Sequence, residues 1–353
     1  MVGTYYLMWL PYKLAWCAAK VLRRKKLFVV HVEDAFDYFL FRNIRRHLSP
    51  LDIVVSSGTI VPKLKPFIED RVKIYHYPFC FPDGVIMFRN AAWKYPVSSI
   101  VKIGLEHGAY NFKRFPHSSY YNLFNLYLMT SGQDVKRLNA LGARTVKSVG
   151  YPKSDSLFDG SYSPAMLDTL RQKLDLDSNK PVLLFSSTWG GSGMSAVHKW
   201  YDKVQELCGS YNVLVTLHPR MSKFYKDYLS QVPGIKYIDA MDIYPYLLLA
   251  DVCIGDTNSL IAEFCIVNKP IITFSITPTA RTMDDVIALI VSISIRVDDF
   301  TELHAAIMEA LATSQITAAA RKQVIGTLID PLDGKAGLRA AQEIIKLIPE
   351  LEP

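Results

Sequence analysis

The sequence predicts an α/β protein that is built from two doubly wound parallel sheets. Short, continuously apolar runs alternate with segments of helical periodicity along the 353-residue chain. Such runs are typical of parallel strands whose two faces are both covered by helices. The alternation pauses at residues 159–163, where small and polar residues gather, so we expect one domain on each side of this point.

The first series of elements covers the N-terminal half of the chain. Apolar runs rich in Val, Ile, Leu and aromatic residues predict strands at 27–32, 51–56, 72–75, 99–105, 126–131 and 145–149. Apolar residues at helical spacing predict helices at 36–47 and 134–141, and basic residues near the end of the first favour its C-terminus. Asp83-Gly84 predicts a turn.

The second series covers the C-terminal half and follows the same criteria. Its strands are expected at 181–185, 211–217, 235–238, 252–254 and 271–274. Its helices are expected at 166–174, 197–207, 224–232, 243–249, 260–267, 301–312, 318–328 and 338–347. Lys269-Pro270 ends one helix because proline cannot continue it, and Asp284-Asp285 is interpreted as the cap of a further helix.

The composition favours a cytoplasmic protein with an anionic partner. The formal net charge of +7 suits a phosphate ligand, an anionic lipid or nucleic acid. Nucleic acid is the least favoured of these, because the sequence contains no RNP-type motif, zinc-finger spacing or long basic run. The five cysteines are scattered and form no CxxC pair, so we expect reduced, mostly buried thiols.

The N-terminal segment, residues 1–26, is predicted to lie at a membrane surface as an interfacial helix. It is apolar and aromatic up to residue 22, but a proline and two lysines interrupt it, so it is not a clean span of about 20 apolar residues. We expect Trp9, Tyr12 and Trp16 to enter the headgroup region and the basic run at 23–26 to meet anionic lipid. The alternative is a core-packed helix followed by a solvated charge run.

The stretch 250–274 reads as strand, polar turn, helix and strand, and its turn is a candidate phosphate site. Free N–H groups, hydroxyls and a positive helix end suit a phosphate or pyrophosphate. Glu263 lies one turn into the helix, where a carboxylate can bond a ribose hydroxyl. The alternative is an ordinary βαβ turn in which Asp256, Asn258 and Ser259 cap the helix.

Three further loops follow predicted parallel strands, at the edge where open α/β sheets place their ligands. His107 is the candidate general base, because an imidazole titrates near neutral pH and can take a proton from a hydroxyl. His218 is a candidate donor to phosphate, helped by the guanidinium of Arg220. Thr188 and the glycines after it are candidates for wrapping a phosphate. The structural alternatives are a strand-end histidine, a turn at Pro219 and a flexible glycine-rich connection.

We expect no metal centre and no cofactor. The sequence has no HExxH motif and no acidic pair between strands of the kind that holds nucleotide-bound Mg²⁺. It also has no phosphate-binding P-loop motif and no G-x-S-x-G elbow. A nucleotide would therefore enter as a donor substrate.

Six short motifs, in order along residues 100–347, resemble the CDP-glycerol glycerophosphotransferase family, the teichoic-acid primases and polymerases. They correspond to the family's HG loop, its G-x-P-(R/K)-x-D segment, its strand ending in P-T-W, its HP pair, its D-Y-S-S turn with a following acidic-aromatic pair and K-P, and its DGKA segment. In this chain they are Glu106-His107-Gly108, Gly150-Tyr151-Pro152-Lys153-Ser154-Asp155, residues 183–189, His218-Pro219, Asp256-Thr257-Asn258-Ser259 with Glu263-Phe264 and Lys269-Pro270, and Asp333-Gly334-Lys335-Ala336. Each motif alone is weak, and six in the right order are considerably more specific.

Four departures from the family pattern lie on the nucleotide side. Ser187 replaces a proline, and Gly190 stands where a basic residue is common. Thr257 replaces a tyrosine and Asn258 replaces the first serine of a pair. The donor therefore need not be CDP-glycerol. Residues 1–98 show little that matches the family.

The resemblance implies a GT-B fold, metal-independent transfer and peripheral attachment to the cytoplasmic face of a bacterial membrane. By the same analogy His107 acts as the base on the acceptor hydroxyl, and Glu263 binds the ribose. His218 and Ser259 hold the donor pyrophosphate with Thr188 nearby. The attacked atom is phosphorus, CMP leaves, and the donors around the pyrophosphate stabilise the charge in place of a metal.

The predicted organisation is a membrane-surface segment at 1–26, an acceptor-side domain at 27–160 and a nucleotide-donor domain at 161–353, with packing of the last helix on the first domain left open. The predicted activity moves glycerol phosphate, or a similar polyol phosphate, from a CDP-activated donor to a hydroxyl of a lipid-linked saccharide or polymer in teichoic-acid or capsule synthesis. Two alternatives stay open: a GT-B glycosyltransferase that uses a nucleotide sugar, and a non-catalytic nucleotide-binding scaffold.

Overall fold

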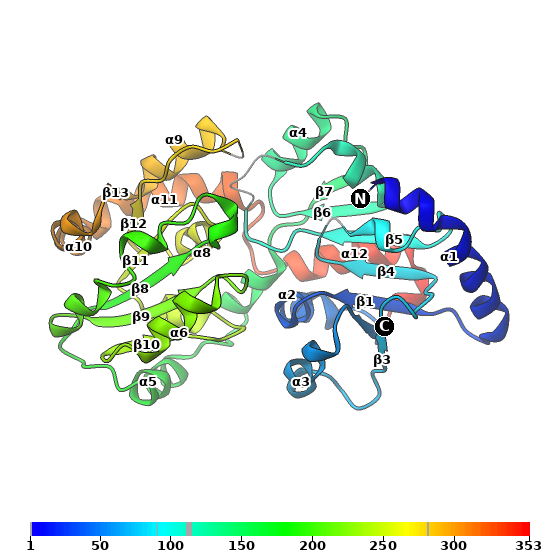
Figure 1. The fold of residues 1–353 in the computed structure, drawn as a ribbon, viewed down its shortest axis with the longest axis horizontal. Coiled ribbons are helices and arrows are strands. Elements are labelled where there is room, and N and C mark those ends of the chain that lie inside the picture. Colours follow the sequence, from blue (N-terminus) through cyan, green and yellow to red (C-terminus); the bar gives the residue numbers. More distant parts are fainter. Residues whose placement is uncertain (1, 90, 111–114, 281) are drawn as a thin grey trace. The chain divides into compact units, whose positions relative to one another are not determined.

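The chain forms two compact units, each built around its own parallel sheet (Figure 1). The computed structural model describes residues 2–89, 91–110, 115–280 and 282–353, apart from the side chains of residues 2–6, 8 and 314–317. The first unit comprises Met1–His107, Phe115–Asp159 and Ile329–Pro353. The second comprises Gly108–Arg114 and Gly160–Leu328.

In the described part of the first unit, seven parallel strands form one sheet in the order β3-β2-β1-β4-β5-β6-β7. The strands are β1 (Phe28–Val32), β2 (Asp52–Val55), β3 (Ile74–His76), β4 (Gly84–Met87), β5 (Val101–Leu105), β6 (Leu126–Met129) and β7 (Val146–Ser148). The chain runs outward from β1 to β3 and then returns to add β4 on the other side of β1. The strand order therefore reverses between β1 and β4, as in a doubly wound sheet.

The helices of the first unit include segments from both ends of the chain, together with α4 from its middle. They are α1 (Val2–Leu22), α2 (Ala35–Arg45), α3 (Val61–Leu64), α4 (Gly132–Ala140) and α12 (Ala336–Leu347). Helix α2 begins with a capping box, in which Asp34 accepts the N–H of Phe36 and Asp37 accepts the N–H of Asp34. Helix α12 packs on α2.

The C-terminal segment returns to the first unit because two of the predicted motifs meet there. The buried carboxylate of Asp155 accepts the backbone N–H groups of Ala336 (3.0 Å) and Gly337 (2.6 Å), at the start of α12. A Cβ at Gly337 would lie 2.3 Å from the carbonyl oxygen of Asn43, so only glycine permits this approach to α2. The second unit accordingly ends at Leu328, and residues 329–353 belong to the first unit, which is the arrangement of the last helix that the predicted range 161–353 left open.

In the described part of the second unit, six parallel strands form a sheet in the order β10-β9-β8-β11-β12-β13. The strands are β8 (Val182–Ser187), β9 (Asn212–Leu217), β10 (Ile235–Tyr237), β11 (Val252–Gly255), β12 (Ile271–Phe274) and β13 (Ile295–Val297). The order reverses between β8 and β11. Its helices are α5 (Pro164–Lys173), α6 (Lys223–Gln231), α7 (Tyr244–Leu249), α8 (Leu260–Ile266), α9 (Asp284–Ile293), α10 (Leu303–Ala312) and α11 (Ser314–Leu328).

Strands β4 and β13 were not predicted. β4 lies next to β1 in the sheet, although its first residue, Gly84, belongs to the pair that predicted a turn. A Cβ at Gly84 would lie 2.9 Å from side-chain atoms of both Phe28 and Ile348, so close packing explains this glycine and a turn does not. β13 has only three residues, too few to show a period.

The helix predicted at 197–207 is wrong. Two 3₁₀ turns, Val197–Lys199 and Val204–Gly209, occupy this region. The apolar positions that suggested a helix are buried, with the rings of Trp200 and Phe185 5.1 Å apart. An apolar residue every three or four positions fits short 3₁₀ turns as well as an α-helix, so the spacing does not separate them.

The prediction for α1 is wrong for two of its three aromatic residues. Tyr12 and Trp16 are buried in the core of the first unit, where they donate hydrogen bonds to the carbonyl oxygens of Cys80 (2.8 Å) and Pro82 (2.7 Å). Each ring packs in an apolar site that also supplies a carbonyl acceptor for its O–H or N–H group. Trp9 lies at the surface, with Nζ of Lys13 4.6 Å from its ring centre.

The outer face of α1 is apolar and exposed. Leu7, Leu10, Leu14 and Val21 are 79%, 57%, 64% and 85% exposed, and their spacing places them along one stripe of the helix. The basic run that follows is partly used in ion pairs, from Arg23 to Asp83 (3.3 Å) and from Lys26 to Glu350 (2.5 Å), while Arg24 and Lys25 are exposed. Among the described helices none is long and apolar enough to cross a membrane.

Candidate functional site

Three neighbouring strands of the second unit carry most of the predicted donor-binding residues. Thr188 follows β8, His218 follows β9, and the turn 256–259 follows β11. Since β9, β8 and β11 are adjacent and parallel, their carboxyl ends meet at one edge of the sheet. The strand order reverses between β8 and β11, which is where open α/β sheets bind ligands.

Asp256 holds two of these loops together. Its buried carboxylate accepts hydrogen bonds from the hydroxyl of Ser187, from the N–H of Thr188 (2.9 Å), from the N–H of Ala196 (2.9 Å) and from Nδ2 of Asn258 (3.0 Å). Burial raises the pKa of Asp256 above its usual value, while these donors favour the ionised form. The structure thus shows Asp256 as an organising residue of the loop after β8.

Two of the four departures from the family pattern have a structural explanation in this network. Ser187 supplies a hydroxyl donor to Asp256 that a proline lacks. Asn258 bridges the turn and the helix, since its Nδ2 donates to Asp256 and its Oδ1 accepts the N–H of Leu260 (2.9 Å) at the start of α8. Asn258 therefore organises the turn before α8, whereas the side chain of Ser259, at the N-cap position of this helix, makes no capping hydrogen bond.

Ser259 lies at the start of α8 and is partly exposed. A Cβ at Gly108 would lie 2.9 Å from Cβ of Ser259, so the glycine permits a close approach of the backbone, within the second unit, to this serine. Glu263, predicted to bind a ribose, is buried one turn further along α8, the helix that packs on α11.

The loop after β8 contains a tight turn in which Gly191 lies against the ring of Trp189. Gly190–Ser192 forms a 3₁₀ turn, and a Cβ at Gly191 would lie 2.2 Å from the ring of Trp189. The backbone at Gly193 has φ +71°, a left-handed conformation that favours glycine. Thr188 is buried, whereas Gly190 and Gly191 are exposed at the surface of this loop.

His218 is held in one tautomer by the turn that follows it. Its Nδ1 accepts the backbone N–H of Arg220 at 3.0 Å, so the neutral ring carries its proton on Nε2. The ring lies 6.4 Å from the ring of Trp189, between centroids, and is partly exposed. Nε2–H is therefore a hydrogen-bond donor at the carboxyl edge of the sheet, and Arg220 is exposed beside it.

His107 follows β5 in the first unit and has a carboxylate as its neighbour. Oε1 of Glu106 lies 3.4 Å from Nδ1 of His107, and the side chains are 12% and 51% exposed. Burial raises the pKa of Glu106 to about 7, and the nearby charge of Asp134 adds to this shift. The role of Glu106 was not predicted, although its place directly before His107 was available as a signal.

The first unit contains a second polar cluster, around His31, that was not predicted from the sequence. His31 is buried at the end of β1, with Nδ1 2.6 Å from the hydroxyl of Tyr95 and Nε2 2.9 Å from Oγ of Ser56. Lys94 donates to Glu33 (2.6 Å) and to Ser56 (3.0 Å). Burial, with Lys94 next, lowers the pKa of His31 to about 3. A histidine inside an apolar run was the available signal.

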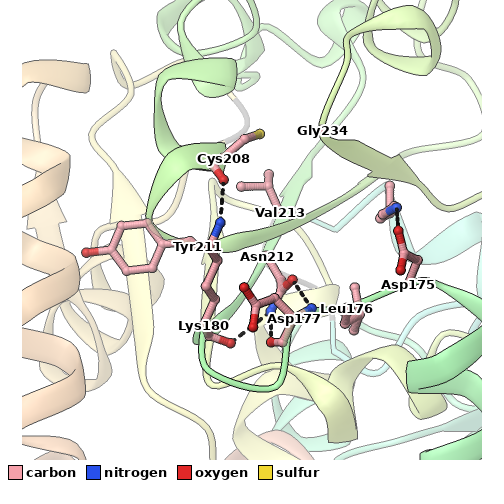
Figure 2. A pocket seen from close by; sticks show the side chains of 10 residues that line it. Asp175, Leu176, Asp177, Lys180, Cys208, Tyr211, Asn212, Val213 and Gly234 are labelled. Carbon is pink, nitrogen blue, oxygen red and sulfur yellow. Dashed lines mark hydrogen bonds and ion pairs between the residues drawn. The ribbon is translucent and has the colours of Figure 1, made fainter.

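A hollow of about 190 Å³ lies at the opposite end of the second sheet, before strands β8, β9 and β10 (Figure 2). The side chain of Asn212 bonds Asp177 and Lys180 there, and Nζ of Lys180 donates to the carbonyl oxygen of Cys208 (3.4 Å). No predicted site residue lines this hollow. Its polar groups join the loops that precede the strands, and we assign it no ligand.

Among the residues that the structure describes, no group of three or more His, Cys, Asp or Glu side chains could hold a metal ion. The described cysteines are free thiols, with Cys80, Cys253 and Cys265 buried.

A family model and several known relatives match much of this chain. The family model of CDP-Glycerol:Poly(glycerophosphate) glycerophosphotransferase matches residues 129–345. A teichoic acid poly(ribitol-phosphate) polymerase of Bacillus spizizenii is 24% identical over 267 residues, which cover 69% of this chain and 40% of the relative. The teichoic acid ribitol-phosphate polymerase TarK of Staphylococcus aureus is 28% identical over 151 residues, 38% of this chain and 28% of the relative.

Solved structures confirm the predicted fold class. The wall teichoic acid polymerase TagF has a TM-score of 0.69 at 14% identity, with 99% of each chain covered. The UDP-GlcNAc 2-epimerase of Neisseria meningitidis has a TM-score of 0.60 at 14% identity, covering 91% of this chain and 100% of that one. With the two doubly wound sheets, these likenesses establish the GT-B class of fold. Because the family model covers more than half of its residues, this chain belongs to the CDP-glycerol:poly(glycerophosphate) glycerophosphotransferase family.

Proposed function

We propose that this protein transfers a polyol phosphate unit from a CDP-activated donor to a hydroxyl of a lipid-linked saccharide or polymer, in the assembly of teichoic acid or capsule. The observation that carries the proposal is the match of the family model to residues 129–345, which include the whole carboxyl edge of the second sheet. The chain spans about 40% of the length of the first relative above, so its activity is inferred from this shared part.

The second unit is proposed to hold the donor. Nε2–H of His218 donates to a phosphate oxygen, and the hydroxyl of Ser259 contributes a second donor. Asp256 and Asn258 hold the loops in place, Thr188 lies at the base of the glycine-rich turn, and Arg220 adds a positive charge. Glu263 is assigned to the ribose. A TagF structure soaked with CDPG supports the cytidine donor by analogy.

His107 of the first unit is proposed as the general base. Its imidazole takes the proton of the acceptor hydroxyl as the oxygen forms a bond to the phosphorus next to the polyol. The bond from that phosphorus to the bridging oxygen breaks, and CMP leaves with the electron pair. The proposal includes transfer without a metal ion, with the donors of the second unit stabilising the charge on the phosphates, so turnover should persist in EDTA.

Calorimetric titration tests the donor assignment without knowledge of the acceptor. We expect CDP-glycerol or CDP-ribitol to bind more tightly than CMP or UDP-GlcNAc. His218→Ala should weaken this binding about 10- to 100-fold, because a hydrogen bond to a charged group contributes about 1.5–3 kcal/mol. His198→Ala is the matched control, since His198 is an exposed histidine of the same unit, and it should leave the affinity unchanged.

The other outcomes of this titration each contradict the proposal. Preference for UDP-GlcNAc would favour the nucleotide-sugar glycosyltransferase. Binding of no nucleotide would contradict the donor site. Cytidine binding, with no release of CMP from the donor when any tested acceptor is added, would favour the nucleotide-binding scaffold.

We also propose that α1 attaches the first unit to the anionic inner face of a bacterial membrane. The support is its exposed stripe of Leu7, Leu10 and Leu14, with the exposed Arg24 and Lys25 at the end of the helix. Burial of apolar area in the acyl region and attraction to anionic headgroups act together in such a segment.

Replacing Leu7, Leu10 and Leu14 together by glutamine should weaken binding to vesicles that contain phosphatidylglycerol by more than 10-fold, because three exposed leucines lose their transfer to the acyl region. The variant leaves Tyr12 and Trp16 in the core, whereas deletion of residues 1–26 would remove both. Sedimentation with vesicles measures the change. Leu141→Gln, 57% exposed elsewhere on the same unit, is the control, and equal binding of the triple variant and the unsubstituted protein would contradict the proposal.

A further inference from the structure

The end of β5 places a largely buried carboxylate beside a half-exposed imidazole. Glu106 is anchored by its backbone, whose N–H donates to the carbonyl oxygen of Leu128 in the neighbouring strand (3.0 Å). Its Oε1 lies 3.4 Å from Nδ1 of His107. The carboxylate therefore lies beside one ring nitrogen of the histidine, and about half of the imidazole side chain remains exposed.

We propose that Glu106 is the positioning residue of His107: its carboxylate accepts Nδ1–H and thereby directs the lone pair of Nε2 toward the acceptor hydroxyl. This inference rests on the proposed function, in which His107 is the base. When a third group orients a histidine base, the hydrogen bond on one ring nitrogen decides whether the other nitrogen can accept a proton.

The proton balance of the pair follows from this arrangement. Before transfer, Glu106 is ionised and the neutral ring carries one proton, on Nδ1. When Nε2 takes the proton of the acceptor hydroxyl, the ring becomes an imidazolium beside the carboxylate. Because Glu106 is only 12% exposed, its charge is poorly screened by water and stabilises the imidazolium more than a surface carboxylate would. The proton later leaves the ring to solvent.

The groups around Glu106 make the pair sensitive to pH near neutrality. Burial, with the charge of Asp134 at the start of α4 next, raises the pKa of Glu106, and Arg137 lies 3.4 Å from Asp134. Burial, with the charge of Glu106 next, raises the pKa of Tyr127 in β6, and Arg89 in the loop after β4 opposes this shift. The pair works only with Glu106 ionised and His107 neutral, so its activity is present above about pH 7 and is lost as the pH falls through that value.

Substitution by Glu106→Gln should separate positioning from simple packing. The amide cannot take the place of a charged acceptor, so we expect kcat to fall about 100-fold while KM for the CDP-polyol donor is unchanged. The acid limb of the pH profile of kcat should also move down by about one unit, because the variant removes the titration of Glu106 and the ring loses the charge that favours its protonation. Glu106→Asp, which keeps the charge, should recover part of kcat and the original limb.

Nitrogen NMR of histidine-labelled protein tests the pair without turnover. The signals of His107 are assigned by their loss in His107→Asn. In the unsubstituted protein we expect the neutral ring to carry its proton on Nδ1 and the midpoint of its titration to lie above 6.5, the ordinary value for histidine. In Glu106→Gln the midpoint should fall and Nε2–H should become populated. A predominant Nε2–H form in the unsubstituted protein would overturn the inference, even if Glu106→Gln does not fold.

The two proposals fail in different ways. If His107→Asn keeps full turnover while the NMR shows the coupled pair, the base is wrong and the pairing of the two residues stands. If His107→Asn loses turnover while Glu106→Gln keeps the tautomer, the midpoint and the acid limb, Glu106 has no positioning role. Glu343→Gln is the matched control, since Glu343 is another ion-paired glutamate of the first unit (2.8 Å to Lys147), and it should change none of these quantities.

Discussion

Replacing His107 by alanine is expected to slow the release of CMP from a CDP-polyol by a factor of about 10³, because general base catalysis typically contributes 10²- to 10⁴-fold. The imidazole follows β5 and is 51% exposed, so its removal leaves no buried cavity and the first unit should stay folded. The rate is measured with a lipid-linked saccharide that the unsubstituted enzyme accepts. Donor affinity by calorimetry should not change, since the donor is assigned to the second unit.

His117→Ala provides the comparison for His107→Ala. His117 is an exposed histidine of the same unit whose ring contacts Ser119 (2.9 Å), so its loss should cost no more than a few-fold in rate. Turnover of His107→Ala within a few-fold of the unsubstituted enzyme would exclude His107 as the base. A rate that is lost together with donor binding would instead point to a folding defect.

The sheets could be predicted from the sequence because a strand that is covered by helices on both faces has apolar residues at successive positions. Where such a run was short or began with glycine, as in β4 and β13, the pattern was too weak. Gly84 is explained by Phe28 and Ile348, which lie 56 and 264 positions away in the chain. A local reading therefore assigns this glycine to a turn, and only the tertiary contact shows why a strand residue there must be small.

The positions of the site loops could be predicted, but the direction of their side chains could not. Parallel topology brings the carboxyl ends of β9, β8 and β11 together wherever those strands are adjacent. Whether a polar residue in such a loop faces a ligand or the protein depends on its tertiary partners. Asp256 turns to Thr188 and Ala196, which are 68 and 60 positions away. Likewise, Tyr12 and Trp16 face carbonyl groups of the first unit and not the surface.

Replacing Asp256 tests how much its carboxylate contributes to the stability of the second unit and to donor binding. Alanine at this position leaves the N–H groups of Thr188 and Ala196, the hydroxyl of Ser187 and the amide of Asn258 without their acceptor. Each buried donor that loses its partner costs about 1–3 kcal/mol, less whatever water and rearrangement recover. We expect the free energy of unfolding of the second unit to fall by about 3–5 kcal/mol, and donor affinity to fall at least 10-fold.

Urea unfolding gives the loss of stability, and amide hydrogen exchange over residues 186–197 shows where it arises. If Asp256 holds the loop, the amides of Thr188 and Ala196 should lose protection in Asp256→Ala before the sheet does. Asp251→Ala is the matched control, because this exposed aspartate accepts one N–H, from Val182 (2.8 Å), at the other end of β11. Its cost should stay near 1 kcal/mol with the loop still protected. Equal losses in the two variants would mean that the four donors around Asp256 contribute no more than one exposed hydrogen bond, and the loop after β8 would then owe its shape to its glycines.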